Sequence, residues 1–196
     1  MAAGRSLARA RYREAIGLLE EAAPAAGTFQ IFQRRMATAL LCSGDRSEAE
    51  RWMRTAVAAS ASATNIGYLA IAVGGLRWDC ADPASVSQLA PGGNASEAMR
   101  WGRQAAALST GPDQQLWLGV SAELAVRAHD TPALRSIVGL LAFDAPQSVA
   151  ALRYAAWLYI FDGDMGEADV ILDRLRERSG HAPRAQDLRA AASLAP

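Results

Sequence analysis

Lysine is absent from this chain of 196 residues: all 20 basic side chains are arginine, and 20 acidic residues balance them to a formal net charge of zero. Without a lysine amine the chain cannot form the Schiff base of pyridoxal-phosphate enzymes, nor supply the lysine of a P-loop. A zero net charge also provides no global field that would recruit nucleic acid or an anionic membrane. The composition therefore excludes several catalytic classes and predicts no nucleic-acid partner.

Histidine and cysteine are scarce, with two of each. His129 and His181 have no second His or Cys at ligand spacing, which predicts no transition-metal site. Cys42 and Cys80 lack CxxC spacing, which favours free thiols in a reducing compartment over a disulfide. Residues 162–167, DGDMGE, lack the further oxygen ligands of a calcium loop. We expect no catalytic residue, no metal and no cofactor; an enzyme using His129 or His181 is a minor alternative.

Long apolar runs are also missing. None reaches the ~18 residues that a membrane span needs, and the arginine-rich start lacks the apolar core of a secretory signal. We expect no direct membrane insertion and a cytoplasmic location, with the periplasm as the alternative if the chain belongs to a larger membrane protein. The alanine-rich, lysine-free composition is what a GC-rich bacterial genome would produce.

A repeat dominates what the sequence does contain. Residues 47–60, SEAERWMRTAVAAS, return as SEAMRWGRQAAALS at 96–109 with nine of fourteen positions identical. An anchor residue a few positions past a turn signal recurs in steps of 34, 49, 36 and 34, at Ala15, Ala49, Ala98, Leu134 and Ala168. A step near 34 is the length of an antiparallel helix pair that buries its apolar face by stacking on neighbours. The step of 49 is such a pair with an insertion.

The turn signals that precede the anchor residues also mark where helices begin. A short polar residue pairs with a Glu three positions later, as in a capping box, at Asp45 and Glu48, Asn94 and Glu97, and Asp164 and Glu167. A glycine precedes each of these caps, where the previous helix must end, and Thr131-Pro132 opens a fourth such helix. Apolar residues recur at helical spacing and no stretch alternates like a strand, so the sequence predicts an all-α fold.

The period, the caps and the small residues together resemble the tetratricopeptide repeat (TPR) family. Small residues mark three positions of each unit in that family, and the matching residues here are Ala37, Ala122 and Ala156, then Ala15, Ala49, Ala98 and Ala168, then Ala22, Ala56 and Ala105. The match covers most of the chain, although Gln33 replaces a large apolar residue and most of the proline signals that end a unit are missing.

The resemblance implies one TPR-like α-solenoid domain over 1–196, with about four to five antiparallel helix pairs. The expected units are about 1–27, 28–60, 61–110 with an insertion at 76–92, 111–144 and 145–180, followed by a capping helix at 183–195. The first unit begins part-way through its first helix. The chain therefore opens either with a half unit or, as we slightly favour, as a domain cut from a longer protein.

The insertion at 76–92 is expected to be a loop, because it contains Pro83, Pro91 and a closing Gly92-Gly93. Its noticeable side chains are Trp78 and Cys80. Long loops in compact repeats often carry function. We favour an interpretation in which Trp78 folds back on the third unit, with a binding role as the alternative.

The resemblance also implies a concave groove lined by the first helix of each pair. The residues at the family's inward positions are Ile31, Arg34, Thr38, Leu41, Thr64, Tyr68, Ile71, Leu116, Glu123, Arg153, Trp157 and Ile160. Aromatic anchors flanked by arginine suit capture of an amphipathic helix or an extended peptide. Equally, tight curvature or the closing helix would bury the same residues.

The function that this pattern favours is a non-catalytic scaffold that binds a partner protein or peptide in the concave groove. The alternative is a ligand-sensing or accessory helical-repeat domain of a larger regulator or of an envelope polysaccharide assembly.

Overall fold

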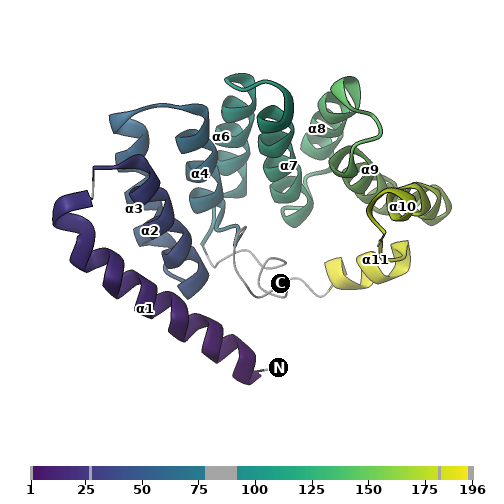
Figure 1. The fold of residues 1–196 in the computed structure, drawn as a ribbon. Coiled ribbons are helices and arrows are strands. Elements are labelled where there is room, and N and C mark those ends of the chain that lie inside the picture. Colours follow the sequence, from purple (N-terminus) through teal and green to yellow (C-terminus); the bar gives the residue numbers. More distant parts are fainter. Residues whose placement is uncertain (1, 27, 78–91, 181, 194–196) are drawn as a thin grey trace.

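The computed structural model describes residues 2–26, 28–77, 92–180 and 182–193 (Figure 1). The helices are α1 (Ala2–Ala26), α2 (Gln30–Ser43), α3 (Arg46–Ala59), α4 (Ala63–Gly74), α6 (Ala95–Ala107), α7 (Gly111–Arg127), α8 (Thr131–Asp144), α9 (Val149–Asp162), α10 (Met165–Ser179) and α11 (Ala185–Ser193). No β-strand occurs within the four described ranges. The prediction of an all-α chain is confirmed.

Each helix packs mainly against its neighbours in sequence, and further contacts join every other helix: α2 to α4, α4 to α7 and α7 to α9. The row of helices forms an arch whose two ends, α1 and α11, curve toward the same side (Figure 1). This packing is consistent with a helical repeat. The buried core runs along the row instead of filling one centre, from Met53 through Leu69 and Leu124 to Ile137 and Leu172.

Three of the turns between paired helices share one backbone geometry. Gly44, His129 and Gly163 lie in the left-handed region with φ of 104°, 52° and 83°. The amide of the following Asp then donates to a carbonyl five residues back, in the bonds Asp45 N to Leu40 O, Asp130 N to Ala125 O, and Asp164 N to Tyr159 O, each at 2.8–2.9 Å. Orphan carbonyls at the end of the first helix are satisfied in this way before the second helix begins.

The predicted N-caps are confirmed as caps but not as capping boxes. The side chains of Asp45, Asn94 and Asp164 each accept the amide three residues on. The cap's own amide is already bonded to the preceding helix, so the Glu does not accept it. Glu97 accepts instead from Arg54, from Trp101 and, at 3.4 Å, from the side-chain amide of Asn94. In the fourth case Thr131-Pro132 does open the helix, α8, and the cap is the preceding Asp130, which accepts from Ala133 N at 3.0 Å.

The insertion leaves and rejoins the fold at one turn. Leu76 N donates to Ile71 O at 2.9 Å as α4 ends, and Asn94 N donates to Val73 O at 2.9 Å just before α6 begins. Because both ends of the insertion bond to the last turns of α4, α6 packs closely on α4 in spite of the extra residues. Residues 78–91, with Trp78 and Cys80, lie outside the described ranges, so the interpretation of Trp78 stays a prediction.

Cys42, at the end of α2, is buried and disulfide-bonded. The prediction of free thiols is therefore wrong for this residue. The chain contains one other cysteine, Cys80. The sequence did not indicate a disulfide at Cys42, because lack of CxxC spacing argues only against a local redox motif.

At the start of the chain the structure has one long helix, α1, where a helix pair was expected, and at the end it has a short helix, α11. The first unit was expected to contain a turn, but α1 is one continuous helix, because residues 6–16 contain no Gly, Pro, Asn or Asp that would end it. At the other end, α11 packs against α9 and α10. It is held by Ala185 N donating to Asp169 Oδ1 at 2.9 Å, and by Arg176 Nη2 donating to Ala182 O at 3.2 Å.

The closest helix crossings lie among α4, α6 and α7, and glycines make them possible. A Cβ added to Gly67 would lie 2.6 Å from ring atom Cδ2 of the buried Trp117. Similar overlaps would occur between Gly74 and Leu124 and between Gly102 and Ser121. The side chains of α7 therefore occupy space that any Cβ at these positions on α4 and α6 would fill.

We predict that Gly67→Ala lowers the free energy of unfolding by about 1–3 kcal/mol, because the rigid Trp117 ring must move from its packed position. Gly139→Ala is the matched control: Gly139 is an exposed position inside α8 with nothing within 4 Å of its added Cβ. That change should raise stability by up to about 1 kcal/mol through helix propensity. Urea unfolding followed by circular dichroism measures both, and equal effects of the two changes would contradict the crossing argument.

Candidate functional site

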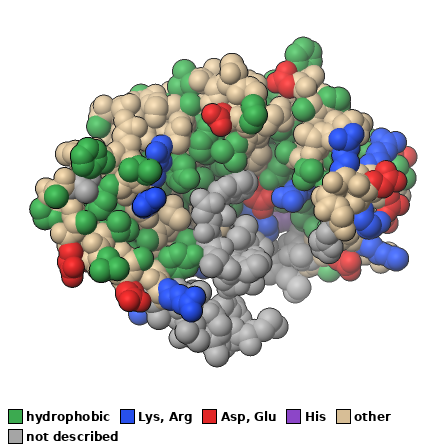
Figure 2. Space-filling model, in the orientation of Figure 1, with side chains coloured by type: hydrophobic (Ala, Val, Ile, Leu, Met, Phe, Trp, Pro, Cys, Tyr) green, Lys and Arg blue, Asp and Glu red, His purple; other side chains and the backbone are tan. Residues whose placement is uncertain are grey.

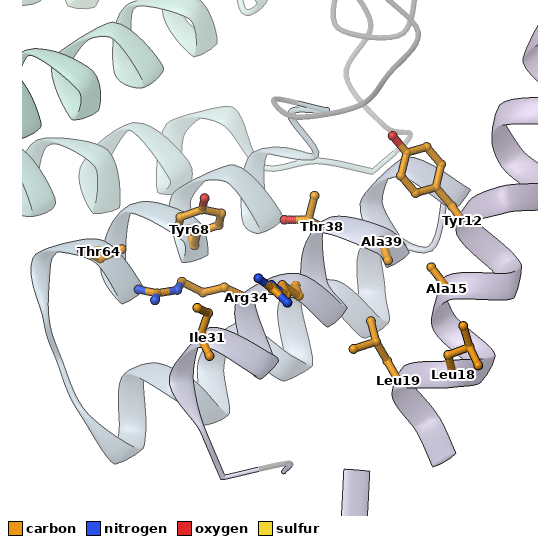
Figure 3. Close-up of a pocket in the computed structure, with 11 residues that line it drawn as sticks. Tyr12, Ala15, Leu18, Leu19, Ile31, Arg34, Thr38, Ala39, Thr64 and Tyr68 are labelled. Atoms are coloured by element: carbon orange, nitrogen blue, oxygen red, sulfur yellow. The ribbon is translucent and has the colours of Figure 1, made fainter. Parts of the chain in front are cut away.

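An open groove of about 910 Å³ lies between α1 and α4, with α2 as its floor (Figure 3). The lining side chains are Tyr12, Ala15, Leu18 and Leu19 from α1, Ile31, Arg34, Arg35, Thr38 and Ala39 from α2, and Thr64 and Tyr68 from α4. On each helix they recur at intervals of three or four residues, some of them as adjacent pairs, which places them on one helix face. Three consecutive helices thus turn one face each toward a common space.

The groove is apolar and partly uncovered. Leu18 and Ile31 are 63% and 57% exposed although both are large aliphatic side chains. Isolated exposed aliphatic residues are ordinary, but here two of them border one hollow that also contains Leu19 and two alanines. The space-filling view shows hydrophobic side chains over the α1 to α4 part of the arch, whereas charged side chains gather over α10 and α11 (Figure 2).

Arginine supplies all the charge of the groove. The guanidinium carbon of Arg34 lies 5.9 Å from the ring centroid of Tyr68, which is the geometry of a cation–π contact. Tyr68 in turn meets Trp117 edge to face at 6.0 Å between ring centroids. Arg35 is exposed on the adjacent position of α2. The groove's charge is therefore connected through Tyr68 to the buried crossing of α4 and α7.

The structure brings together only part of the groove predicted from the sequence. Ile31, Arg34, Thr38, Thr64 and Tyr68 line one hollow. Other members of the predicted set are buried in the core: Leu41, Ile71, Trp157 and Ile160. These four side chains therefore do not line the hollow.

The wall formed by α1 was not predicted from the sequence. Its residues belong to an expected unit that was incomplete and had no assigned groove positions. Tyr12, Ala15 and Leu19 follow an i, i+3, i+7 pattern, and Arg35 adjoins a residue that was predicted. The helical pattern of this segment was therefore the available signal, since a long terminal helix without a packing partner on that face can form the side of a groove.

Farther along the arch, a buried carboxylate is fully occupied by its own chain. Glu123 of α7 accepts from Arg127 Nε at 2.9 Å and Nη2 at 2.6 Å, and from the hydroxyl of Tyr154 at 3.2 Å. Glu123 is only 8% exposed. Of the remaining predicted residues in this region, Arg153 is exposed and Leu116 is 38% exposed. These contacts make Glu123 a structural ion-pair partner in this state of the molecule.

Two further chemical features bear on function. Within the described ranges, no group of three or more His, Cys, Asp or Glu side chains lies close enough together to hold a metal ion. Among the helices described, none combines the length and apolar character that crossing a bilayer requires.

The chain was compared with protein-family models, with curated proteins and with solved structures, and none of the three comparisons gives a match.

Burial raises the pKa of Tyr154 above its ordinary value, and the negative charge of Glu123 adds to the effect. A phenol whose pKa is raised by folding stabilises the protein below the unfolded pKa of about 10, and that contribution is lost as the pH rises above it.

We predict that the free energy of unfolding falls above about pH 10 by up to ~1.4 kcal/mol per pH unit. The Tyr154→Phe variant should lose this part of the alkaline dependence, and thermal melts from pH 8 to 11.5 measure it. Parallel decline of both proteins would contradict it.

Proposed function

We propose that this chain is a non-catalytic protein-interaction module: a TPR-like α-solenoid of four helix pairs, with α1 and α11 at its ends, that holds a partner peptide in the groove of α1, α2 and α4. The observation that carries the proposal is a hollow of about 910 Å³ bordered by exposed Leu18 and Ile31. Binding of a partner that covers such an apolar surface is favoured by roughly 25 cal/mol per Å² of apolar area buried.

The form of the groove favours a peptide. It crosses three helices and is open along its length, so an extended or helical segment can lie in it with one apolar face down (Figure 3). The alternative, a ligand-sensing or accessory domain of a larger regulator or envelope assembly, has one supporting observation: the volume lies within the roughly 300–1,000 Å³ typical of small-molecule sites.

We test the proposal by selecting displayed 12-residue peptides on the purified chain and measuring the affinity of the enriched sequences. Ile31→Glu places a charge in the apolar part of the groove, and we expect it to weaken binding at least ~10-fold, or about 1.4 kcal/mol. Leu140→Glu is the matched control, because Leu140 is 47% exposed on α8, outside the groove.

Loss of binding in the Leu140 variant and not in the Ile31 variant would place the site elsewhere. A metabolite panel that raises the melting temperature while no peptide is enriched would favour the ligand-sensing alternative, because any ligand of the native state stabilises it.

We also infer that the module works in an oxidising compartment, such as the periplasm. The support is the disulfide at Cys42, since disulfides persist in oxidising compartments and are rare in the cytosol. This replaces the cytoplasmic expectation.

For protein produced in an oxidising compartment, we predict no reaction of Cys42 with iodoacetamide in guanidinium without reductant, where burial no longer protects a thiol. Reduction should lower the stability by about 2–4 kcal/mol. Alkylation followed by peptide mass spectrometry, with melting curves before and after reduction, measures both effects. A labelled Cys42 in the unreduced protein would contradict the inference.

A further inference from the structure

The groove contains positive charge and no negative charge. Of the 11 side chains that line it, two are arginines and none is Asp or Glu. Helices α2 and α4, which provide the floor and one wall, contain no acidic residue in their sequences. No side chain of the groove's own lining can neutralise Arg34 and Arg35.

The two groove arginines differ in this respect from many others in the molecule. Arg46, Arg51, Arg54, Arg127 and Arg135 each form an ion pair with an Asp or Glu, at distances between 2.5 and 2.9 Å. Neither Arg34 nor Arg35 forms one with any residue that the structure describes. Their charges remain available to something outside the chain.

Arg34 is also held in place. It is half-buried, and its guanidinium lies over the ring of Tyr68, so its position at the α4 wall is partly fixed before any partner binds. A partly buried charge is screened less by salt than one in open solvent. Thr38 and Thr64 add hydroxyl groups beside it, which can donate to a carboxylate (Figure 3).

We propose that the occupant of the groove is an acidic amphipathic peptide. Its apolar side chains would cover Leu18, Leu19 and Ile31, and its Asp or Glu side chains would meet Arg34 and Arg35. The proposal of an acidic peptide rests on the proposed function, a peptide-binding groove, and specifies the chemical character of the partner. A phosphodiester chain also carries negative charge, but it has no apolar face to cover the exposed aliphatic residues. A fatty acid would leave much of its alkyl chain in solvent in so open a groove.

The experiment uses two matched libraries of 12-residue peptides displayed on phage. Both contain the same apolar residues and Ser at randomised positions; one adds Asp and Glu, and the other adds Lys and Arg. Selected peptides are synthesised, and their affinities for the full chain are measured by fluorescence anisotropy. We expect binders from the acidic library only, with affinities that fall about three- to ten-fold between 50 and 500 mM NaCl.

The Arg34→Gln/Arg35→Gln double variant should weaken the acidic peptides by about ten-fold, since two partly exposed ion pairs are lost. Arg174→Gln/Arg178→Gln on α10 is the matched control, because both of these arginines are exposed on a helix outside the groove. It removes the same charge and should leave affinity unchanged. Circular dichroism melts of both double variants confirm that each remains folded.

The outcomes separate the two proposals. Equal binding of both libraries, with loss on Ile31→Glu, would overturn the acidic partner and leave the peptide groove in place. Preference for the basic library would also overturn it. No binding from either library would remove the peptide groove itself. Stabilisation by laurate in that case would identify a small amphiphile as the occupant.

Discussion

The close crossing of α4 and α7 connects the interior of the molecule to its surface groove. Gly67 lacks a side chain, and Trp117 packs directly against that part of α4. The ring of Trp117 meets Tyr68 edge to face, and Tyr68 lies beneath the guanidinium of Arg34. A glycine in the core thus helps to determine where a charge is held in the groove. Packed interiors are stiff, so an arginine supported in this way is better positioned than one on a free surface.

Features with a local physical cause could be read from the sequence. The helices, the caps at Asp45, Asn94 and Asp164, and the close approach of small residues at Ala49, Ala98 and Ala168, all fully buried, follow from neighbouring residues and from period. The reciprocal half of the capping box failed because it depends on the preceding helix: the amide of Asp45 bonds Leu40 O across the turn. His129 takes the left-handed position that Gly44 and Gly163 occupy in the other two turns, so the turn between α7 and α8 has no glycine that would mark it in the sequence.

The groove could be predicted only in part, because the family's inward positions specify direction and not exposure. Ile31 and Trp157 were both assigned to inward positions, although to different ones within their pairs, yet Ile31 is 57% exposed and Trp157 is 7% exposed. Trp157 meets Phe161 of the same helix at 5.6 Å between ring centroids, and Phe161 meets His129, from the turn between α7 and α8, at 5.5 Å. That second contact depends on where the neighbouring helices lie. Likewise the α1 wall depends on where a long terminal helix lies, which no repeat period encodes.

The region around α7 and α9 differs from the groove of α1, α2 and α4 in whether its charged side chains are paired within the chain. At α7 and α9, Glu123 is surrounded by Arg127 and Tyr154, so its negative charge is satisfied inside the chain. At α2, two arginines lie on a helix without a single acid, and the neighbouring α4 has no charged residue at all. A surface whose charges are paired gains little from a charged partner, since the partner must first break existing bonds. Arg34 and Arg35 form no ion pair with the residues that the structure describes, so a charged group that met them beside exposed Leu18 and Ile31 would break no existing bond.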